Sequence, residues 1–155
     1  MHDGLDEVVQ YIADKSFELK NKYTDATNAP LEFACIFCQT EGEFQRFSDL
    51  AKERGHVVQE TPSGKTYLLD VAIQTKAGAL RLLKVREPDI KRKERGDADF
   101  NTSYPEFKMK YEKNPRFELI TRDSFEMLRL SDPEFDVMSC FSNIPLSKNL
   151  GIKLK

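Results

Sequence analysis

Residues 33–38 have the sequence Phe-Ala-Cys-Ile-Phe-Cys, and residues 40–54 follow as Thr-Glu-Gly-Glu-Phe-Gln-Arg-Phe-Ser-Asp-Leu-Ala-Lys-Glu-Arg. The first stretch is a short apolar run between polar residues, which predicts a buried strand. The second predicts a helix, because Thr40 can cap it, Glu43 stands at capping-box spacing, and apolar residues recur along one side. Gly55 is expected to end that helix as the residue after its C-cap.

More strands are predicted after this helix, separated by turns that contain glycine. They cover residues 56–60, 65–75 and 80–87. Pro88 ends the last of them, because proline has no backbone N–H to pair with a neighbouring strand. The predicted order over residues 31–88 is therefore strand, helix and then three strands, which is a βαβββ module.

The same order recurs in the second half of the chain. The predicted elements are a strand at 97–102, a helix at 103–113, and strands at 117–121, 125–130 and 135–141. Pro105 would stand in the first turn of that helix, where proline is tolerated. A repeated unit indicates the organisation of the whole fold. The other interpretation is an α+β domain whose order of elements repeats by coincidence.

An amphipathic helix is predicted ahead of both modules, at residues 5–20, followed by a polar linker at 21–30. A length of 155 residues favours one domain, residues 1–155. We expect an α+β fold in which the helix precedes two tandem βαβββ modules, residues 31–88 and 97–145.

Composition excludes several classes of protein. Apolar residues make up 39% of the chain and include 11 Phe, which suffices for a core, and the net charge of −2 gives no global affinity for polyanions. No apolar run is long enough to span a membrane, and residues 1–7 lack the pattern of a secretory signal. Three cysteines, an odd number, suggest reduced thiols and a cytoplasmic protein. No phosphate-binding loop or cofactor motif is present, so no cofactor is expected.

Two tandem βαβββ modules resemble the vicinal oxygen chelate superfamily, which includes glyoxalases, bleomycin-resistance proteins and extradiol dioxygenases. The N-terminal helix and the segment 82–88, Leu-Leu-Lys-Val-Arg-Glu-Pro, are more similar to its YecM-type branch. The resemblance covers residues 31–145 and implies a cupped mixed sheet. It also implies a metal held by side chains on the first and last strands of each module.

The metal positions implied by the resemblance fall on unsuitable residues. They are Phe33 and Lys84 in the first module, and Asp97 with a residue among 138–140 in the second. Phenylalanine cannot ligate a metal, and a protonated lysine has no lone pair to offer. Asp97 alone is a credible ligand, so we expect a degenerate metal site with no bound metal.

Lys84 and Asp97 are expected on the concave face within ion-pair reach of each other. A buried lysine needs a counter-charge, because its desolvation otherwise costs several kcal/mol. The pair could replace the metal as the organising charge, or Lys84 could act as an acid or hold an anion. A purely structural ion pair is the other interpretation, and it is the one favoured by the usual behaviour of such pairs.

The remaining candidate ligand-binding residues surround that pair. Arg86 shares a strand face with Lys84, and Asp99 shares one with Asp97. Glu126 and Arg129 are added from the second module. Two carboxylates on one face could bind a hard cation or form an acid–base pair, but contact with the two cations is favoured.

The cysteines and histidines offer no separate site. Cys35 and Cys38 have the spacing of a redox or metal motif, but residues three apart on a strand point to opposite faces, so no disulfide is expected. Cys140 is predicted on another strand. His2 and His56 are the only histidines, which excludes a histidine cluster.

Two functions remain open, and the sequence does not decide whether the protein is an enzyme. The first is binding of a small anionic ligand in the cupped sheet. The second is an interaction protein that uses helix 5–20 or the basic linker 84–95. Charges in the linker largely cancel and it lacks aromatic residues, so nucleic acid is not the expected partner, while a homodimer fits either function. An open polar cavity would favour the first, and a cup closed by Phe33, Phe37 and Leu82 the second.

Overall fold

The computed structural model describes residues 4–154 and shows an α+β fold. Its elements are, in chain order, α1 (Leu5–Tyr23), β1 (Leu31–Phe37), α2 (Glu41–Arg54), β2 (Gly55–Thr61), β3 (Gly64–Thr75), β4 (Gly78–Arg86), β5 (Gly96–Phe100), α3 (Tyr104–Tyr111), β6 (Phe117–Thr121), β7 (Glu126–Leu130), β8 (Val137–Ser142) and α4 (Leu146–Asn149). The predicted order of strands and helices is confirmed over both modules.

All eight strands form one mixed sheet in the order β2-β3-β4-β1-β5-β8-β7-β6. In each module the first strand pairs in parallel with the last, as β1 does with β4 and β5 with β8. The other two strands follow by antiparallel pairing. The modules meet through the antiparallel pair β1–β5, in which Ala34 stands opposite Ala98. The two first strands therefore lie side by side at the centre of the sheet, in an arrangement with approximate twofold symmetry.

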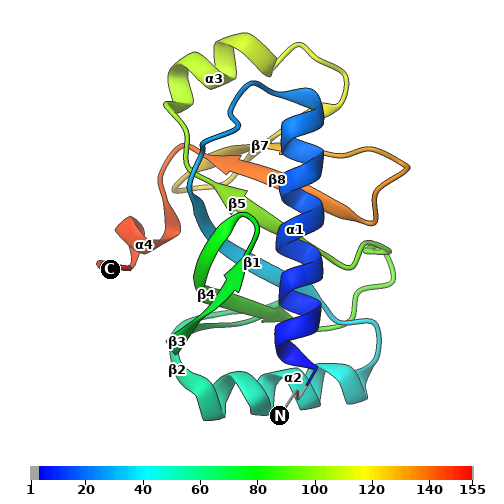
Figure 1. The fold of residues 1–155 in the computed structure, drawn as a ribbon, viewed down its shortest axis with the longest axis vertical. Helices are drawn as coiled ribbons and strands as arrows, with labels where there is room; N and C mark the ends of the chain where they lie inside the picture. The colour runs from blue at the N-terminus through cyan, green and yellow to red at the C-terminus, as the bar shows by residue number, and fades with distance from the viewer. Residues whose placement is uncertain (1–3, 155) are drawn as a thin grey trace.

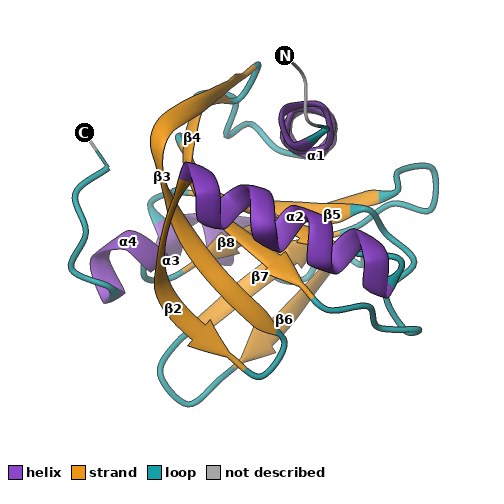
Figure 2. Ribbon diagram, turned by 90° about the horizontal axis from the view of Figure 1, so that it is seen from below, coloured by secondary structure: helices purple, strands orange, loops and turns teal. Residues whose placement is uncertain are grey.

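Three helices lie along one side of the sheet. Figure 1 shows α1 along the long axis of the molecule, with α2 and α3 near its two ends. Helix α2 contacts β2, β3 and β4 of the first module, whereas α1 contacts strands of both modules. The short α4 is separated from α1 by strands of the sheet (Figures 1 and 2). The opposite face of the sheet is thus left to α4 and the segments beside it.

Helix α1 is fixed to the sheet by polar as well as apolar contacts. Ser16 Oγ donates to the carbonyl of Met138 at 3.0 Å, and Ser139 Oγ donates to the carbonyl of Ser16 at 2.6 Å. Both serines are fully buried, so this reciprocal pair satisfies groups that would be costly to leave unpaired. Gly96 is required for close approach to β1, since a Cβ there would lie 2.2 Å from the carbonyl oxygen of Cys35, and it would also lie 2.7 Å from Ile12 Cδ1 of α1.

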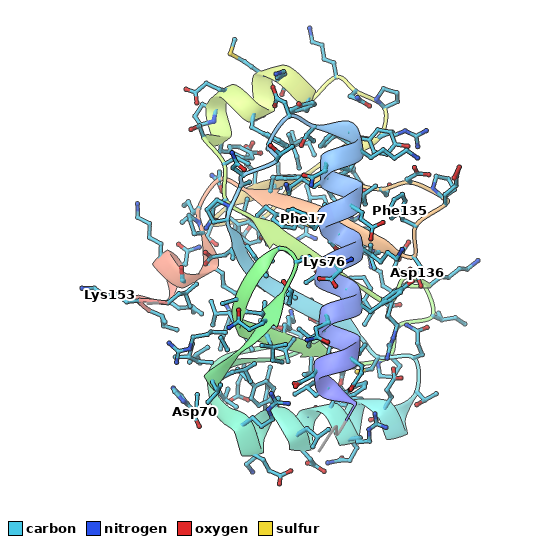
Figure 3. All side chains as sticks on the ribbon, viewed as in Figure 1. Phe17, Asp70, Lys76, Phe135, Asp136 and Lys153 are labelled. Carbon is cyan, nitrogen blue, oxygen red and sulfur yellow. The ribbon has the colours of Figure 1, made fainter. Side chains whose placement is uncertain are left out.

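Hydrogen bonds also hold the flanks of α1. Its Asp14 Oδ1 accepts from the backbone N–H of Lys76 at 2.8 Å, and Tyr11 donates to Asp136 Oδ1 at 2.6 Å. Lys76 and Asp136 lie beside the helix in Figure 3. The first contact comes from the first module and the second from the other, so α1 ties the two modules together.

The cap predicted for α2 is confirmed, but the role predicted for Gly55 is wrong. Thr40 Oγ1 accepts from the N–H of Glu43 at 3.0 Å. Gly55 has φ −171°, which is extended, and it begins β2 directly after the helix. A Cβ at Gly55 would lie 2.1 Å from the carbonyl oxygen of Leu68. Glycine is required there for close approach to β3, and not for a left-handed helix end.

Other differences from the predicted elements are local. Helix α1 extends to Tyr23 instead of ending at residue 20, and α4 was not predicted. Among residues 4–154, no helix is long and apolar enough to cross a membrane.

A candidate ligand cavity on the concave face

A cavity of about 190 Å³ opens on the face of the sheet opposite the core that contains α1. Its polar and sulfur-containing lining comes from Cys35, Lys84, Arg86, Asp97, Asp99, Cys140, Ser142 and Asn149. Its apolar lining comes from Phe33, Phe37, Phe125, Met127, Ile144 and Leu146. Four of the six predicted ligand-binding residues are brought together here, and the concave face is an open cavity with a mixed lining.

Strand alternation explains which residues reach the cavity. On β4, Leu83 and Val85 are fully buried in the core beneath the helices, whereas Lys84 and Arg86 line the cavity. Across the centre of the sheet, β1 places Cys35 opposite Lys84 on one side and opposite Asp97 on the other. Three neighbouring strands therefore supply the charged part of the lining.

The metal positions implied by the fold do not form a metal site. The register of β5 with β8 makes Cys140 the counterpart of Lys84, so the four positions are Phe33, Lys84, Asp97 and Cys140. Two of these residues cannot ligate a metal. No group of three or more His, Cys, Asp or Glu side chains that could hold a metal ion occurs among residues 4–154. The side chains present do not fit a metal of this superfamily.

The expected ion pair between Lys84 and Asp97 is not formed. Both side chains line the cavity, but no ion pair of 4.0 Å or less joins them. The reason is the strand order, since β1 lies between β4 and β5 and two strand spacings separate their backbones by about 10 Å. Burial lowers the pKa of Lys84 from its usual 10.5, and the charge of Asp97 only partly opposes this effect.

Asp99 is the most deeply buried charged group in the lining, with 4% of its surface exposed. Its Oδ2 accepts from Ser142 Oγ at 2.8 Å, while its Oδ1 is buried and has no hydrogen-bond partner. Burial raises the pKa of Asp99 to about 8, and repulsion from Asp97 acts in the same direction. At neutral pH this side chain is therefore mainly a neutral carboxylic acid.

Asp97 differs from its neighbour in its surroundings. Cys140 Sγ donates to Asp97 Oδ2 at 3.6 Å, and Arg129 and Arg86 lie near enough to favour the charged form. Burial nevertheless raises the pKa of Asp97 to about 6. A carboxyl group with this pKa can accept or release a proton near neutral pH, which is the property required of a general acid or base.

Arg86 is the second cation of the cavity. Its guanidinium lies 5.5 Å from the centre of the Phe37 ring and 3.8 Å from Asp89, and 27% of its side chain is exposed. The contact with the ring restricts the guanidinium, while the ion pair is long and partly solvated. Arg86 thus retains donors that a ligand at the mouth of the cavity can use.

Glu126 and Arg129 lie outside the cavity lining. Glu126 Oε2 accepts from Tyr104 at 2.8 Å and from Lys108 at 2.7 Å, so it faces α3 on the side of the sheet away from the cavity. Arg129 stands opposite Cys140 but donates to Glu118 at 2.8 Å. Of the two, Arg129 acts on the cavity only through its charge, which lowers the pKa of Asp97.

The thiols lie on both faces of the sheet, as predicted. Cys35 lines the cavity, whereas Cys38 is packed in the core beneath the helices. All three cysteines, including Cys140, are free and buried. His56 lies exposed on β2, away from the cavity, and His2 is outside the described residues.

The segment after β8 forms a wall of the cavity that was not predicted. Ile144, Leu146 and Asn149 line it. The backbone N–H of Ser147 donates to Glu32 Oε2 at 2.6 Å, and Asn101 donates to Glu32 Oε1 at 2.8 Å. Glu32 is buried on β1 and so holds this segment against the sheet. The apolar residues Ile144 and Leu146 were the only signal in the sequence.

The comparisons with known proteins concern the fold. No family model matches the chain, and no curated protein matches its sequence. A solved structure described as structural genomics protein EC4020 superposes with a TM-score of 0.74 at 11% identity, over 94% of this chain and 88% of that one. A glyoxalase/bleomycin resistance protein/dioxygenase superfamily member from Vibrio splendidus 12B01 superposes with a TM-score of 0.44 at 12% identity, over 72% of this chain and 97% of that one.

The fold assignment follows from the topology itself. Two βαβββ modules joined through their first strands in one mixed sheet form the arrangement that the resemblance implied. The chain therefore has the fold of paired βαβββ modules that the resemblance implied, while membership of the vicinal oxygen chelate superfamily stays a prediction. Membership of the YecM-type branch stays a prediction.

Proposed function

We propose that the cavity on the concave face binds a small anionic molecule, held by Lys84 and Arg86. One observation carries this proposal. Lys84 lines the cavity, is partly buried, and forms no ion pair within 4.0 Å with any carboxylate of residues 4–154. A buried cation without a counter-charge is unfavourable, and a ligand that brings a negative charge would supply the missing partner.

The dimensions of the cavity support a small ligand. The cavity has a volume of about 190 Å³. Drug-sized ligands usually occupy larger pockets. The apolar wall formed by Phe33, Phe125 and Leu146 suits a short hydrocarbon portion, and the cations suit a carboxylate.

The alternative of an interaction protein has less support. Leu5, Val9 and Ile12 of α1 are fully buried against the sheet, so the apolar stripe of this helix is already covered. In the basic linker, Arg95 donates two hydrogen bonds of 2.9 Å to Glu43. The apolar stripe of α1 is therefore not free for a partner, and Arg95 of the linker is already paired.

Binding can be tested with pivalate, a compact carboxylate, by nuclear magnetic resonance titration of the wild-type protein and the variant Lys84→Met. Methionine keeps the length of the side chain and removes its charge. Lost hydrogen bonds to a charged group weaken binding about tenfold or more. We expect shifts at β4 and β5 in the wild type and at least a tenfold loss of affinity in the variant.

Lys65→Met is the matched control. Lys65 lies on the adjacent strand β3, is half exposed, and does not line the cavity. Its substitution should leave the affinity unchanged. Equal affinities for the wild type and Lys84→Met, or equal losses in both variants, would overturn the proposal.

A further inference from the structure

The unpaired oxygen of Asp99 points to a second feature of the ligand. Asp99 lines the cavity, and its Oδ1 is buried without a hydrogen-bond partner, although Oδ2 is satisfied by Ser142. Buried polar groups in proteins are almost always paired, and an exception at a binding cavity indicates where a ligand group belongs. A ligand group that forms a hydrogen bond would satisfy this oxygen.

A hydroxyl group meets this requirement better than a carbonyl or an ammonium group. It can donate to an ionised carboxylate, and it can accept from a neutral carboxylic acid. A carbonyl oxygen can only accept, and an ammonium group can only donate. Because burial raises the pKa of Asp99 to about 8, both forms of the side chain occur near neutral pH, and a hydroxyl group pairs with either of them.

The cations define the other end of the ligand. Lys84 and Arg86 lie on β4, and Asp99 lies on β5 across the intervening strand β1. The cavity thus has a cationic side and an acidic side, separated by about 10 Å between strand backbones. A ligand that contacts both sides must carry unlike polar groups at its two ends.

We propose that the ligand is a small hydroxycarboxylate, whose carboxylate contacts Lys84 and Arg86 and whose hydroxyl group forms a hydrogen bond with Asp99 Oδ1. This inference rests on the proposed function and adds the class of ligand to it. The apolar wall of Phe33, Phe125 and Leu146 would contact the hydrocarbon portion between the two groups.

The test compares ligands that differ only in one group of the same size. One pair is 2-hydroxyisobutyrate with pivalate, and the other is 3-hydroxy-3-methylbutyrate with 3,3-dimethylbutyrate. In each pair a hydroxyl replaces a methyl group. Pairing a buried polar group that is otherwise unsatisfied should strengthen binding about tenfold. We expect the hydroxy acid to bind more tightly in at least one pair, measured by calorimetry on the full chain.

The variant Asp99→Val should remove this preference, because valine has a similar size and no polar atom. Asp70→Val is the control, since Asp70 projects from the surface near β2 and β3 (Figure 3) and does not line the cavity. In the wild-type protein, the carboxyl carbon resonance of Asp99 should shift with the hydroxy acid and not with its methyl analogue. This readout does not depend on the stability of the variant.

The outcomes separate the two proposals. Equal binding within both pairs, a preference that survives in Asp99→Val, or tighter binding of 2-aminoisobutyrate would overturn the hydroxycarboxylate. Carboxylate binding that still depends on Lys84 would then leave the anionic ligand standing. Failure of every acid to bind would overturn both.

Discussion

At the scale of single residues, Asp99 illustrates how position determines the chemistry of a side chain. Asp97 and Asp99 lie on the same strand face, two residues apart, yet burial raises the pKa of one to about 6 and of the other to about 8. Asp97 lies near two arginines, whereas Asp99 lies near Asp97 and Glu32. The same residue type thus provides a mainly charged group and a mainly neutral one at neutral pH.

The raised pKa of Asp99 predicts a pH-dependent effect of Asp99→Asn on stability. The pKa in the folded protein, about 8, lies above the usual 3.8, so the native state binds the proton more tightly. The contribution of Asp99 to the free energy of unfolding of the wild type is fully present below pH 4 and is lost as the pH rises towards 8. Asparagine cannot ionise, so the variant should gain on the order of a few kcal/mol relative to the wild type between pH 5 and pH 8.

Urea unfolding of both proteins at pH 5 and pH 8 measures this gain. Asp70→Asn serves as the control, because Asp70 is exposed. A difference between wild type and Asp99→Asn that is the same at the two pH values would show that Asp99 ionises normally in the folded protein.

Part of the candidate site could be predicted from single residues. Alternation along a strand placed Lys84, Arg86 and Asp99 on the correct face, because that pattern is local. The predicted ion pair between Lys84 and Asp97 was wrong, because it depended on the order of the strands in the sheet, which is a long-range property. The prediction that Glu126 lines the cavity was wrong. The face on which a β7 residue lies depends on the register of β7 with β8, which pairs Leu128 with Phe141.

At the scale of elements, β1 separates two chemical environments, and Cys35 on β1 and Cys38 directly after it report on both. Burial raises the pKa of the Cys35 thiol well above 9.0 and that of Cys38 to about 12. Burial also raises the pKa of the Cys140 thiol on β8. Because the thiolate is the reactive form, all of these thiols should be inert in the folded protein.

We therefore expect almost no reaction with a disulfide reagent at pH 8 under native conditions, and reaction of all three thiols after unfolding in guanidinium. Absorbance after addition of the reagent measures the number of reactive thiols in the native and in the unfolded protein. Rapid native labelling of Cys35 would show that the cavity is more open than the structure indicates. A stable loss of two thiols mapped to Cys35 and Cys38 would contradict the strand assignment.

The elements of the two modules could be predicted because caps, turns and apolar runs are local signals. Helix α4 could not, because it has only four residues and no apolar periodicity. Its position depends on Glu32, whose buried carboxylate accepts from Ser147 across more than a hundred residues of sequence. The wall of the cavity was missed for that reason.

At the scale of the whole molecule, α1 and the pair β1–β5 join the modules. We expect residues 1–155 to unfold as one domain in a single transition, because separating the modules would expose both α1 and the central strand pair. Ser139→Ala removes a buried hydrogen bond to α1 and should cost about 1–3 kcal/mol. The urea concentration at the midpoint of unfolding should fall by the same amount for both modules.

The midpoints can be measured by monitoring methyl resonances during urea unfolding. Leu69 reports on the first module and Leu128 on the second. Ser124→Ala, in an exposed turn, is the control and should leave the midpoint unchanged. Two separate midpoints, or a shift confined to the second module, would show that the modules are independent domains.

The duplicated architecture has a further consequence for the cavity. Equivalent positions of the two modules carry different residues, since Lys84 corresponds to Cys140 and Cys35 to Asp99. The site is therefore symmetric in its backbone but not in its chemistry, with cations on one side, carboxyl groups on the other and an apolar wall that includes Leu146. A molecule held at three unlike points differs in energy from its mirror image in the same site. We therefore expect that a chiral ligand of the proposed class binds in preference to its mirror image.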